Sequence, residues 1–292
     1  MTTRVWKFNV EPAEEHLRLD QLVAARTGLS RRAARTVLEL GGVQAGRKRV
    51  RVAGKTLAAG TEVRVAHDDA LGVPVDLTVP VLYEDDWLLV VDKPAGMASQ
   101  GTQASDRHDL QALLQRQRPG QFLALQHRLD QGTSGVLVLA KHPAAHLGVQ
   151  FQARTLAKTY LARISAPLEA CSVDLPIGRL RGGPPTRYGC AGDLADPRPA
   201  RTDFRPADPG EVADLVPGCW VVALPHTGRT HQIRVHLAHL GRPVLGDGLY
   251  FGEPSAAGLW LHAWKLELEH PVTGVRLLLA AAPTRFLAQA AP

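Results

Sequence analysis

Short apolar runs of β-prone residues recur from residue 81 to residue 281, and they constrain the fold more than any other feature. The clearest are WLLVV (87–91), VLVLA (136–140), KTYLARISA (158–166), CWVVAL (219–224) and VRLLLAA (275–281). Runs of this length, rich in valine and leucine, favour strands over helices. Helical spacing appears in DLQALLQRQ and HQIRVHLAHL. We therefore expect an α+β fold whose main domain is a mixed, mainly antiparallel sheet with flanking helices.

Positive charge is concentrated in one segment near the N-terminus. Between Arg18 and Lys55 the chain carries ten cations and two acids, Asp20 and Glu39, a local balance of +8 against +6 for the whole chain. The remainder is therefore slightly acidic. A local basic patch of this size is typical of a surface that binds nucleic-acid phosphates. The alternative is an ordinary solvated helix with surface arginines, and charge alone does not separate the two.

The basic segment has the pattern of a small α+β module. Ser30 is typical of an N-cap for the helix RRAARTVLEL, and two glycines follow it as a stop signal. On this helix Arg31 and Arg35 lie one turn apart and share a face. The β-like pieces VQA, VRV and TEVRV come next, separated by glycines. We expect Arg31, Arg32 and Arg35 to contact the phosphates of such a partner.

A stretch with acids, glycine and prolines, HDDALGVPVDLTVP at 67–80, marks a boundary between two parts of the chain. We expect a small α+β domain at residues 1–72, a linker at 73–80 and the main domain at 81–292. Residues 181–210 are rich in glycine, proline and arginine, and we expect them to form an inserted loop.

Several classes of protein are disfavoured. No run approaches the roughly 18 apolar residues that a membrane span needs. The start, MTTRVWKFNVEPAEEH, lacks the apolar segment of a signal peptide, so we expect a cytoplasmic protein with no membrane partner. The three cysteines are far apart and predict neither a disulfide framework nor a thiolate zinc site. His231, His236 and His239 lack H-E-x-x-H spacing, and no metal site is expected.

The segment HRLDQGTSG, residues 127–135, places an acid directly before a predicted buried strand. Asp130 precedes the small residues 132–135, and glycines there would let the backbone approach a ligand closely. Thr133 and Ser134 could hydrogen-bond the turn or orient the carboxylate. Two interpretations stay open: a carboxylate that reacts with or binds a ligand, or one that only caps the turn. A serine hydrolase is disfavoured because the G-x-S-x-G elbow is absent.

The longer segment HRLDQGTSGVLVLAK resembles the signature of the RluA family of pseudouridine synthases. The chain as a whole resembles the RluC/RluD-like members of this family, which carry an N-terminal S4 domain. Four more segments resemble family segments in the family's order: VDKPAGMAS, KTYLA, TGRTHQIRVHLAHLGRPVLGD and LWLHAWKLELEHPVTG. The likeness covers nearly all of residues 80–285. RLDQLVAARTGLSRRAARTVLELGGVQAG resembles the S4 family of RNA-binding modules, although residues 43–46 depart from its usual valine-asparagine-glycine turn.

The resemblance implies roles for five positions. Asp130 matches the catalytic aspartate, Tyr160 the active-site tyrosine and Arg229 the basic residue that pairs with the aspartate. Leu261 matches an aliphatic residue that packs against the target base. Arg128 lies where family members send an arginine toward the RNA. The two positions after the aspartate, of which the first is usually charged and the second typically acidic, are glutamine and glycine here.

The implied reaction makes sense of these residue types. Pseudouridine forms when the N-glycosidic bond of uridine breaks, the uracil turns and C5 bonds to C1′. Nothing is oxidised and no group is added, so we expect no cofactor. A carboxylate can attack the sugar or the base, or abstract a sugar proton. To stay ionised in a pocket that excludes water, Asp130 needs a nearby cation, for which Arg229 is the candidate. Tyr160 offers a ring for stacking and a hydroxyl for proton transfer.

The expected partner is RNA reached by base flipping, with large-subunit (23S) ribosomal RNA favoured by analogy with S4-bearing relatives and transfer RNA as the alternative. Two other classes stay open. A non-catalytic RNA-binding or ribosome-assembly factor would not need Asp130, Tyr160 and Arg229 together. A methyltransferase would need a cofactor pocket, and no glycine-rich cofactor signature is present. We expect a monomer.

Overall fold

A computed structural model describes residues 3–68, 77–148, 150, 156–181 and 186–288. The chain divides into two compact units. The N-terminal unit comprises Met1–Leu77 and Gln100–Pro119, and the main unit comprises Thr78–Ser99 and Gly120–Pro292. In the parts of the chain that the structure describes, no helix is long and apolar enough to cross a membrane.

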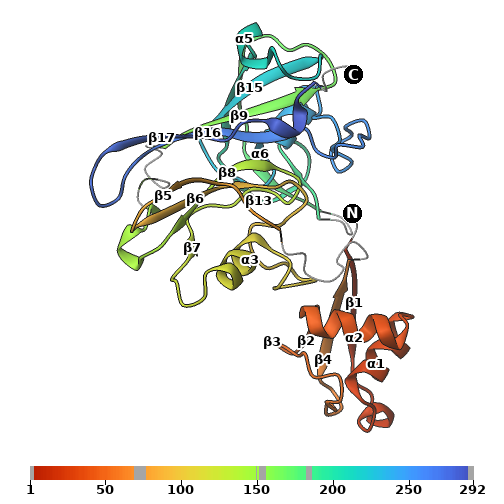
Figure 1. Cartoon of the computed structure of the whole chain (residues 1–292). Helices are drawn as coiled ribbons and strands as arrows, with labels where there is room; N and C mark the ends of the chain where they lie inside the picture. Colours follow the sequence, from red (N-terminus) through yellow and green to blue (C-terminus); the bar gives the residue numbers. More distant parts are fainter. Residues whose placement is uncertain (1–2, 69–76, 149, 151–155, 182–185, 289–292) are drawn as a thin grey trace. The chain divides into compact units, whose positions relative to one another are not determined.

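The N-terminal unit combines helices with a small antiparallel sheet, whose strand order is β1-β4-β2-β3 (Figure 1). Its core is apolar and includes Leu22, Leu38 and Val63. In chain order the elements are β1 (Arg4–Asn9), η1 (Pro12–Glu14), α1 (Leu19–Thr27), α2 (Arg31–Leu40), β2 (Val43–Ala45), β3 (Lys48–Arg49), β4 (Glu62–His67) and α3 (Leu110–Gln117).

Helix α2 begins and ends where the sequence predicted. The Ser30 side chain accepts a hydrogen bond from the Ala33 amide at 3.1 Å, and Gly41 closes the helix with a left-handed φ of 83°. Such a φ favours glycine because it carries no Cβ. The predicted strand VQA is β2, but the predicted strand VRV does not form, since β3 covers Lys48–Arg49.

The division of the chain differs from the predicted domains, because residues 100–119 group with the N-terminal unit. Arg49 donates to the backbone oxygens of Thr102 at 2.5 Å and Gln103 at 3.3 Å. Arg51 pairs with Asp106. These two arginines, which the sequence analysis counted in the basic patch, therefore bind groups of their own unit. Of the predicted linker, residues 73–76 lie outside the described residues.

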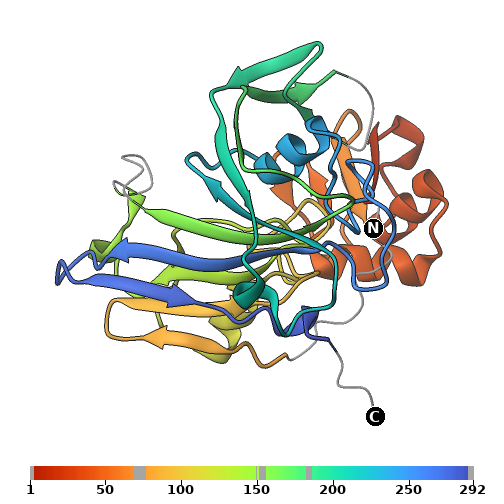
Figure 2. The same ribbon diagram turned by 90° about the horizontal axis from the view of Figure 1, so that it is seen from above.

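The main unit is built on a mixed, mostly antiparallel sheet with the strand order β10-β14-β15-β9-β16-β8-β6-β5. In addition, β17 pairs with β16 and β7 with β8; among the described pairs only β16 and β8 run parallel. Figures 1 and 2 show β16 and β17, in blue, side by side near the middle of the sheet. Helix α6 packs against β14 and β15.

The elements of the main unit, in chain order, are β5 (Val81–Glu84), β6 (Leu88–Lys93), β7 (Ala124–Leu125), β8 (Ser134–Ala140), η2 (Pro143–Ala145), β9 (Ala157–Ile164), β10 (Cys171–Asp174), β11 (Ile177–Leu180), β12 (Tyr188–Gly189), β13 (Leu194–Arg198), β14 (Arg201–Pro206), α5 (Pro209–Val212), β15 (Cys219–Pro225), α6 (Gln232–His239), β16 (Leu261–Glu269), β17 (Arg276–Ala280) and η3 (Thr284–Phe286). The predicted strands and the predicted helix of this unit are confirmed.

The segment expected to be an inserted loop at 181–210 is largely strand where it is described. Strands β12 and β13 flank β11 in a separate sheet, and β14 joins the main sheet. In β14, Thr202 and Phe204 are buried while Arg201 is exposed, which is the alternation of a half-buried strand. The frequent prolines, glycines and arginines hid this alternation. Residues 182–185 lie outside the described residues.

Candidate active site

Asp130 lies in the turn that leads into β8, and the backbone on both sides of it is fixed. The amide of Thr133 donates to the Asp130 carbonyl oxygen at 3.0 Å. On the other side, the Ser99 hydroxyl donates to the Leu129 carbonyl at 2.8 Å and accepts from the Leu129 amide at 3.0 Å. The carboxylate is 26% exposed. Asp130 is thus held in place while its side chain stays open to a ligand.

The glycine at the second position of β8 is required by the packing of the sheet. Gly135 has a φ of 113°, and a Cβ there would lie 2.1 Å from the carbonyl oxygen of Ala263 on β16. No other residue type fits where β8 meets β16. Gly132 faces Leu259, where a Cβ would lie 3.0 Å away. Both glycines are therefore in close contact with neighbouring strands and loops of the protein.

Arg234, and not Arg229, forms the ion pair with Asp130. Its Nη1 donates to Asp130 Oδ2 at 3.0 Å, while its Nε and Nη2 donate to both carboxylate oxygens of Asp247 at 2.6 and 2.8 Å. The Arg234 side chain is 10% exposed and that of Asp247 is 1% exposed. The bidentate bond to Asp247 fixes the plane of the guanidinium, which leaves one N–H aimed at Asp130.

The predicted pairing of Asp130 with Arg229 is wrong for a geometric reason. Arg229 lies in the loop before α6, is exposed, and donates through Nε to the Pro199 carbonyl at 3.0 Å. Arg234 lies inside α6, where the residues from Gln232 to Leu237 are all buried. An arginine between isoleucine and valine in HQIRVHLAHL was the signal in the sequence, because a fully buried arginine needs an acidic partner.

The carboxylate of Asp130 does not cap its own turn. Across the described residues, its oxygens have Arg234 and His231 as their polar neighbours, and no backbone amide donates to them. Ser134 instead bonds the His262 ring at 2.8 Å, so it does not orient the carboxylate. The interpretation of Asp130 as a turn cap is therefore not supported.

Lys93 is a buried ammonium that joins the loop after β6 to the loop of Asp130. It donates to the carbonyl oxygens of Pro94 at 2.8 Å, Met97 at 2.6 Å and Gln131 at 3.4 Å, and it is fully buried. Burial lowers its pKa to about 7, and the negative charge of Asp130 acts in the opposite direction. Lys93 was not among the predicted site residues, although a lysine that ends the apolar run LLVVDK is a signal of a buried cation.

Tyr160 and Leu261 lie on neighbouring strands at the same side of the sheet. Tyr160 on β9 faces Ala263 on β16, and Leu261 faces Ala162 two residues further along β9. Residues opposite each other in antiparallel strands project to one face. Burial raises the pKa of the Tyr160 hydroxyl, and the charge of Asp130 raises it further. Tyr160 therefore keeps its proton beside the carboxylate at neutral pH.

The remaining predicted RNA contacts are Arg128 in the main unit and three arginines of α2 in the N-terminal unit. Arg128 is exposed and makes no hydrogen bond or ion pair with any residue that the structure describes. In the N-terminal unit, Arg31 and Arg35 both bond the carboxylate of Asp20, at 3.4 and 2.8 Å, while the Arg32 side chain is exposed.

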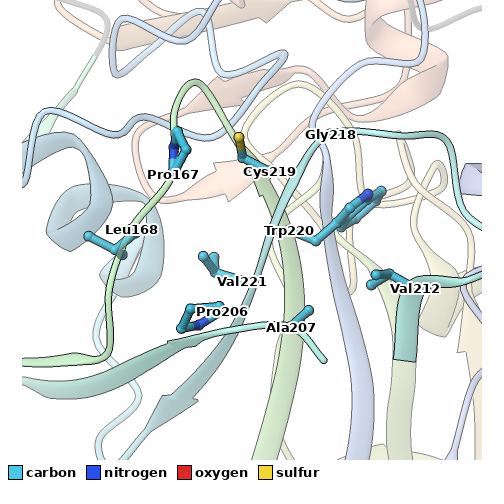
Figure 3. A pocket seen from close by; sticks show the side chains of 9 residues that line it. All are labelled: Pro167, Leu168, Pro206, Ala207, Val212, Gly218, Cys219, Trp220 and Val221. Carbon is cyan, nitrogen blue, oxygen red and sulfur yellow. The ribbon is translucent and has the colours of Figure 1, made fainter. Parts of the chain in front are cut away.

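An apolar cavity of about 210 Å³ lies elsewhere in the main unit (Figure 3). None of the residues with a predicted catalytic or binding role lines it. Its walls come mainly from β15 and from the segments around Pro167 and Pro206; the lining residues are Pro167, Leu168, Pro206, Ala207, Val212, Gly218, Cys219, Trp220 and Val221. The candidate active site is therefore defined by the cluster at Asp130 and not by this cavity.

The sequence of the main unit matches a known class of RNA-modifying enzymes. Residues 87–239, which include Asp130 and Arg234, match the family model described as RNA pseudouridylate synthase. The chain belongs to the RluA family of pseudouridine synthases and is an RNA pseudouridine synthase.

Named pseudouridine synthases are similar to this chain in sequence and in structure. The dual-specificity RNA pseudouridine synthase RluA of Vibrio parahaemolyticus is 36% identical over 68% of this chain and 80% of its own length. The ribosomal large subunit pseudouridine synthase D of Nitrosomonas europaea is 35% identical over 77% of this chain and 66% of its own length. The solved structure of human RNA Pseudouridylate Synthase Domain Containing 1 superposes with a TM-score of 0.58 at 25% identity, covering 75% of this chain and 94% of its own.

Proposed function

We propose that this enzyme converts a uridine of large-subunit ribosomal RNA to pseudouridine, with Asp130 as the catalytic carboxylate. One observation carries the assignment of Asp130. Its carboxylate is open to a ligand, whereas the arginine that pairs with it is buried and fixed by a second carboxylate. A turn-capping or purely structural aspartate needs no such arrangement.

In the reaction the N1–C1′ bond of uridine breaks and a C5–C1′ bond forms. The proton on C5 leaves and N1 takes up a proton, so that no atom is gained or lost overall. Asp130 is the group placed to attack the nucleotide or to accept a proton, and Arg234 stabilises its charge. Tyr160, which keeps its hydroxyl proton, supplies a ring for stacking and a neutral donor.

The uridine reaches Asp130 by leaving its helix, which costs a few kcal/mol. Tyr160 and the aliphatic Leu261, on one face of the sheet, offer the flipped base apolar contacts in exchange. Arg128 is exposed and lies two residues before Asp130. It is therefore in position to contact the RNA strand from which the base departs.

The N-terminal unit acts as an S4-type RNA-binding module. Its support is the resemblance of residues 18–46 to that family together with the exposed arginines of α2. Its arginines contact phosphates and so contribute affinity more than choice of sequence.

Ribosomal RNA is supported by the relative named as a ribosomal large subunit enzyme. The relative named as dual-specificity makes transfer RNA the second candidate substrate. A tritium-release assay distinguishes these two substrates. Ribosomal RNA and transfer RNA are taken from cells that lack the gene and are labelled with tritium at C5 of uridine. Each RNA is then incubated with the enzyme, and the released tritium is measured. Release from ribosomal RNA alone supports the proposal, release from transfer RNA alone overturns the substrate, and release from neither overturns both.

A further inference from the structure

Tyr250 has a buried hydroxyl with two hydrogen-bond partners in the described part of the chain. The residue is 4% exposed. Its oxygen lies 3.1 Å from the backbone nitrogen of Tyr188 and 2.8 Å from Nδ1 of His231. Tyr188 comes from β12, in the segment that the sequence analysis expected to be a loop.

These two bonds determine which nitrogen of His231 carries the proton. A backbone amide can only donate, so the Tyr250 oxygen accepts from Tyr188. The hydroxyl proton, out of reach of water, must then go to the remaining partner, and Nδ1 of His231 accepts it. Burial lowers the pKa of His231, so the ring is neutral at neutral pH. A neutral imidazole whose Nδ1 accepts carries its proton on Nε2.

Nε2 faces the catalytic carboxylate without bonding to it. It lies 3.9 Å from Asp130 Oδ2, beyond hydrogen-bond distance, and the His231 side chain is 19% exposed. Arg234 already occupies the same oxygen of Asp130. The proton on Nε2 is therefore held beside the carboxylate and available to a ligand.

The backbone of His231 is held in an unfavourable conformation, which fixes the direction in which Nε2 of its ring points. His231 has a φ of 57°, in the left-handed region that non-glycine residues rarely adopt. The next residue, Gln232, stabilises the loop, since its Oε1 accepts from the Arg229 amide at 3.0 Å and from the Thr227 hydroxyl at 2.5 Å. Strain of this kind persists where the surroundings impose it, often at functional sites.

We propose that His231 is a substrate-binding residue whose Nε2–H donates to an acceptor oxygen of the target uridine, with Tyr250 fixing the tautomer. The acceptor is an oxygen of the uracil or of its ribose, the two groups that a nucleotide presents beside Asp130. This inference rests on the proposed site at Asp130.

The tautomer is tested on the full chain without RNA. Long-range proton–nitrogen NMR of protein labelled with ¹⁵N-histidine, at about pH 8 where a free histidine is neutral, distinguishes the two ring nitrogens. The signals of His231 are those missing in His231→Gln. We expect Nδ1 to be unprotonated and Nε2 to carry the proton. In Tyr250→Phe, which removes the donor, the fraction of the other tautomer should rise. A proton on Nδ1 in the unsubstituted protein overturns the inference.

The role in binding the nucleotide is tested by single-turnover pseudouridine formation. His231→Gln keeps an N–H donor near the position of Nε2, whereas His231→Leu removes it. We expect the leucine variant to lose about tenfold or more in rate and the glutamine variant to keep most of it. His239→Leu, the same change at an exposed histidine of α6, is the matched control and should match the unsubstituted enzyme.

The outcomes are separable from a failure of the proposed function. If Asp130→Asn is inactive while His231→Leu turns over normally, His231 binds no substrate group and the catalytic assignment of Asp130 stands. If glutamine is as impaired as leucine with the fold intact, a structural role for the ring replaces the donor role. If Asp130→Asn is active, the site itself is wrong, whatever the tautomer of His231.

Discussion

Each unit of this enzyme contains a carboxylate held by arginine, and the two clusters are built in opposite ways. In the N-terminal unit Asp20 is fully buried, while its partners Arg18, Arg31 and Arg35 have side chains that are 48%, 55% and 50% exposed. The three bonds to its oxygens are 3.2, 3.4 and 2.8 Å long. The exposed guanidinium groups of these arginines therefore present positive charge to solvent, and the buried carboxylate of Asp20 holds them in place.

In the main unit the arginine is buried and the carboxylate is open. Arg234 is 10% exposed, Asp247 behind it is 1% exposed, and Asp130 in front is 26% exposed. The site therefore presents the carboxylate of Asp130, paired from behind by Arg234. The comparison shows that the same ion pair can display either charge, depending on which partner the fold buries. A surface for phosphates needs the first arrangement, and a site where a carboxylate reacts needs the second.

The pKa of Asp20 shows how strongly its arginines hold the N-terminal cluster. Burial by itself would raise the pKa of Asp20, but the hydrogen bonds from Arg35 and Arg18 lower it to about 2. Because the pKa in the folded state is depressed, the stabilisation from this cluster is present above the unfolded value of about 4 and is lost as the pH falls through about 2. The N-terminal cluster thus keeps its charges throughout the physiological range.

The largest expected effect comes from removing the open charge of the main unit. Asp130→Asn keeps the size of the side chain and leaves Arg234 bonded to Asp247, so the fold should survive. Single-turnover pseudouridine formation should fall on the order of 10⁴-fold or more, as when a reacting group is deleted. Binding of RNA should change little, because phosphate contacts dominate affinity. Substantial turnover in this variant would contradict the assignment of the carboxylate.

A smaller loss should follow from replacing the buried arginine by lysine. Arg234→Lys keeps the charge but cannot bond Asp247 through two nitrogens and reach Asp130 with a third. The carboxylate then shifts, and a displacement of about 1 Å costs on the order of 10²-fold in rate. The matched control is Arg229→Lys at the exposed position, which should turn over normally. A larger loss in the control would restore Arg229 as the partner in catalysis. Melting temperatures of both variants test whether the fold is kept.

Sequence patterns predicted the local features and missed the distant pairings. Ser30 and the glycine after Leu40 bound helix α2 because capping depends on neighbours in the chain. Asp130 was found because a family signature surrounds it. Arg234 was not distinguished from Arg229, since its partners Asp130 and Asp247 are brought together only by the folded sheet and α6. In α6 the residues from Gln232 to Leu237 are all buried, so their pattern does not show which side faces the site.

Asp20 was missed for a different reason. In a segment of ten cations it counted only as a subtraction from the net charge. Asp20 lies in the first turn of α1, and its carboxylate bonds the N-cap residue Arg18 and two arginines of α2, an arrangement that depends on how α1 packs on α2. Net charge contains no information on which charged side chains are held in place by their neighbours.

The exposed arginines of α2 should control affinity and leave catalysis unchanged. In the triple variant Arg31→Gln, Arg32→Gln and Arg35→Gln, binding of ribosomal RNA should weaken by about tenfold or more. The slope of log affinity against log salt should become shallower by about 2, since each phosphate contact contributes roughly 0.7–0.9. Turnover at saturating RNA should stay the same. Arg276→Gln, at an arginine that is 80% exposed in the main unit, is the control. An unchanged slope in the triple variant would contradict the S4-type role.

The smallest effect is the most discriminating, because the two explanations predict opposite signs. Asp20→Asn adds one unit of positive charge to the basic patch, so net charge alone predicts tighter binding of RNA. If Asp20 instead holds the arginines in position, their side chains become free and must be ordered on binding, at about 0.5–1.5 kcal/mol for each immobilised side chain. For three arginines the lower end of this range is about 1.5 kcal/mol, and the added positive charge offsets part of it, so affinity should fall about threefold. Glu39→Gln is the matched control, since Glu39 is an exposed acid of α2 that makes no ion pair with the residues described, and its loss should tighten binding slightly.

Measuring the RNA affinity of both variants over a range of salt, with melting curves to confirm folding, distinguishes the two explanations. Tighter binding in Asp20→Asn, equal to that of Glu39→Gln, would mean that the buried acid plays no part in presenting the arginines and that the contrast with Asp130 is one of burial only.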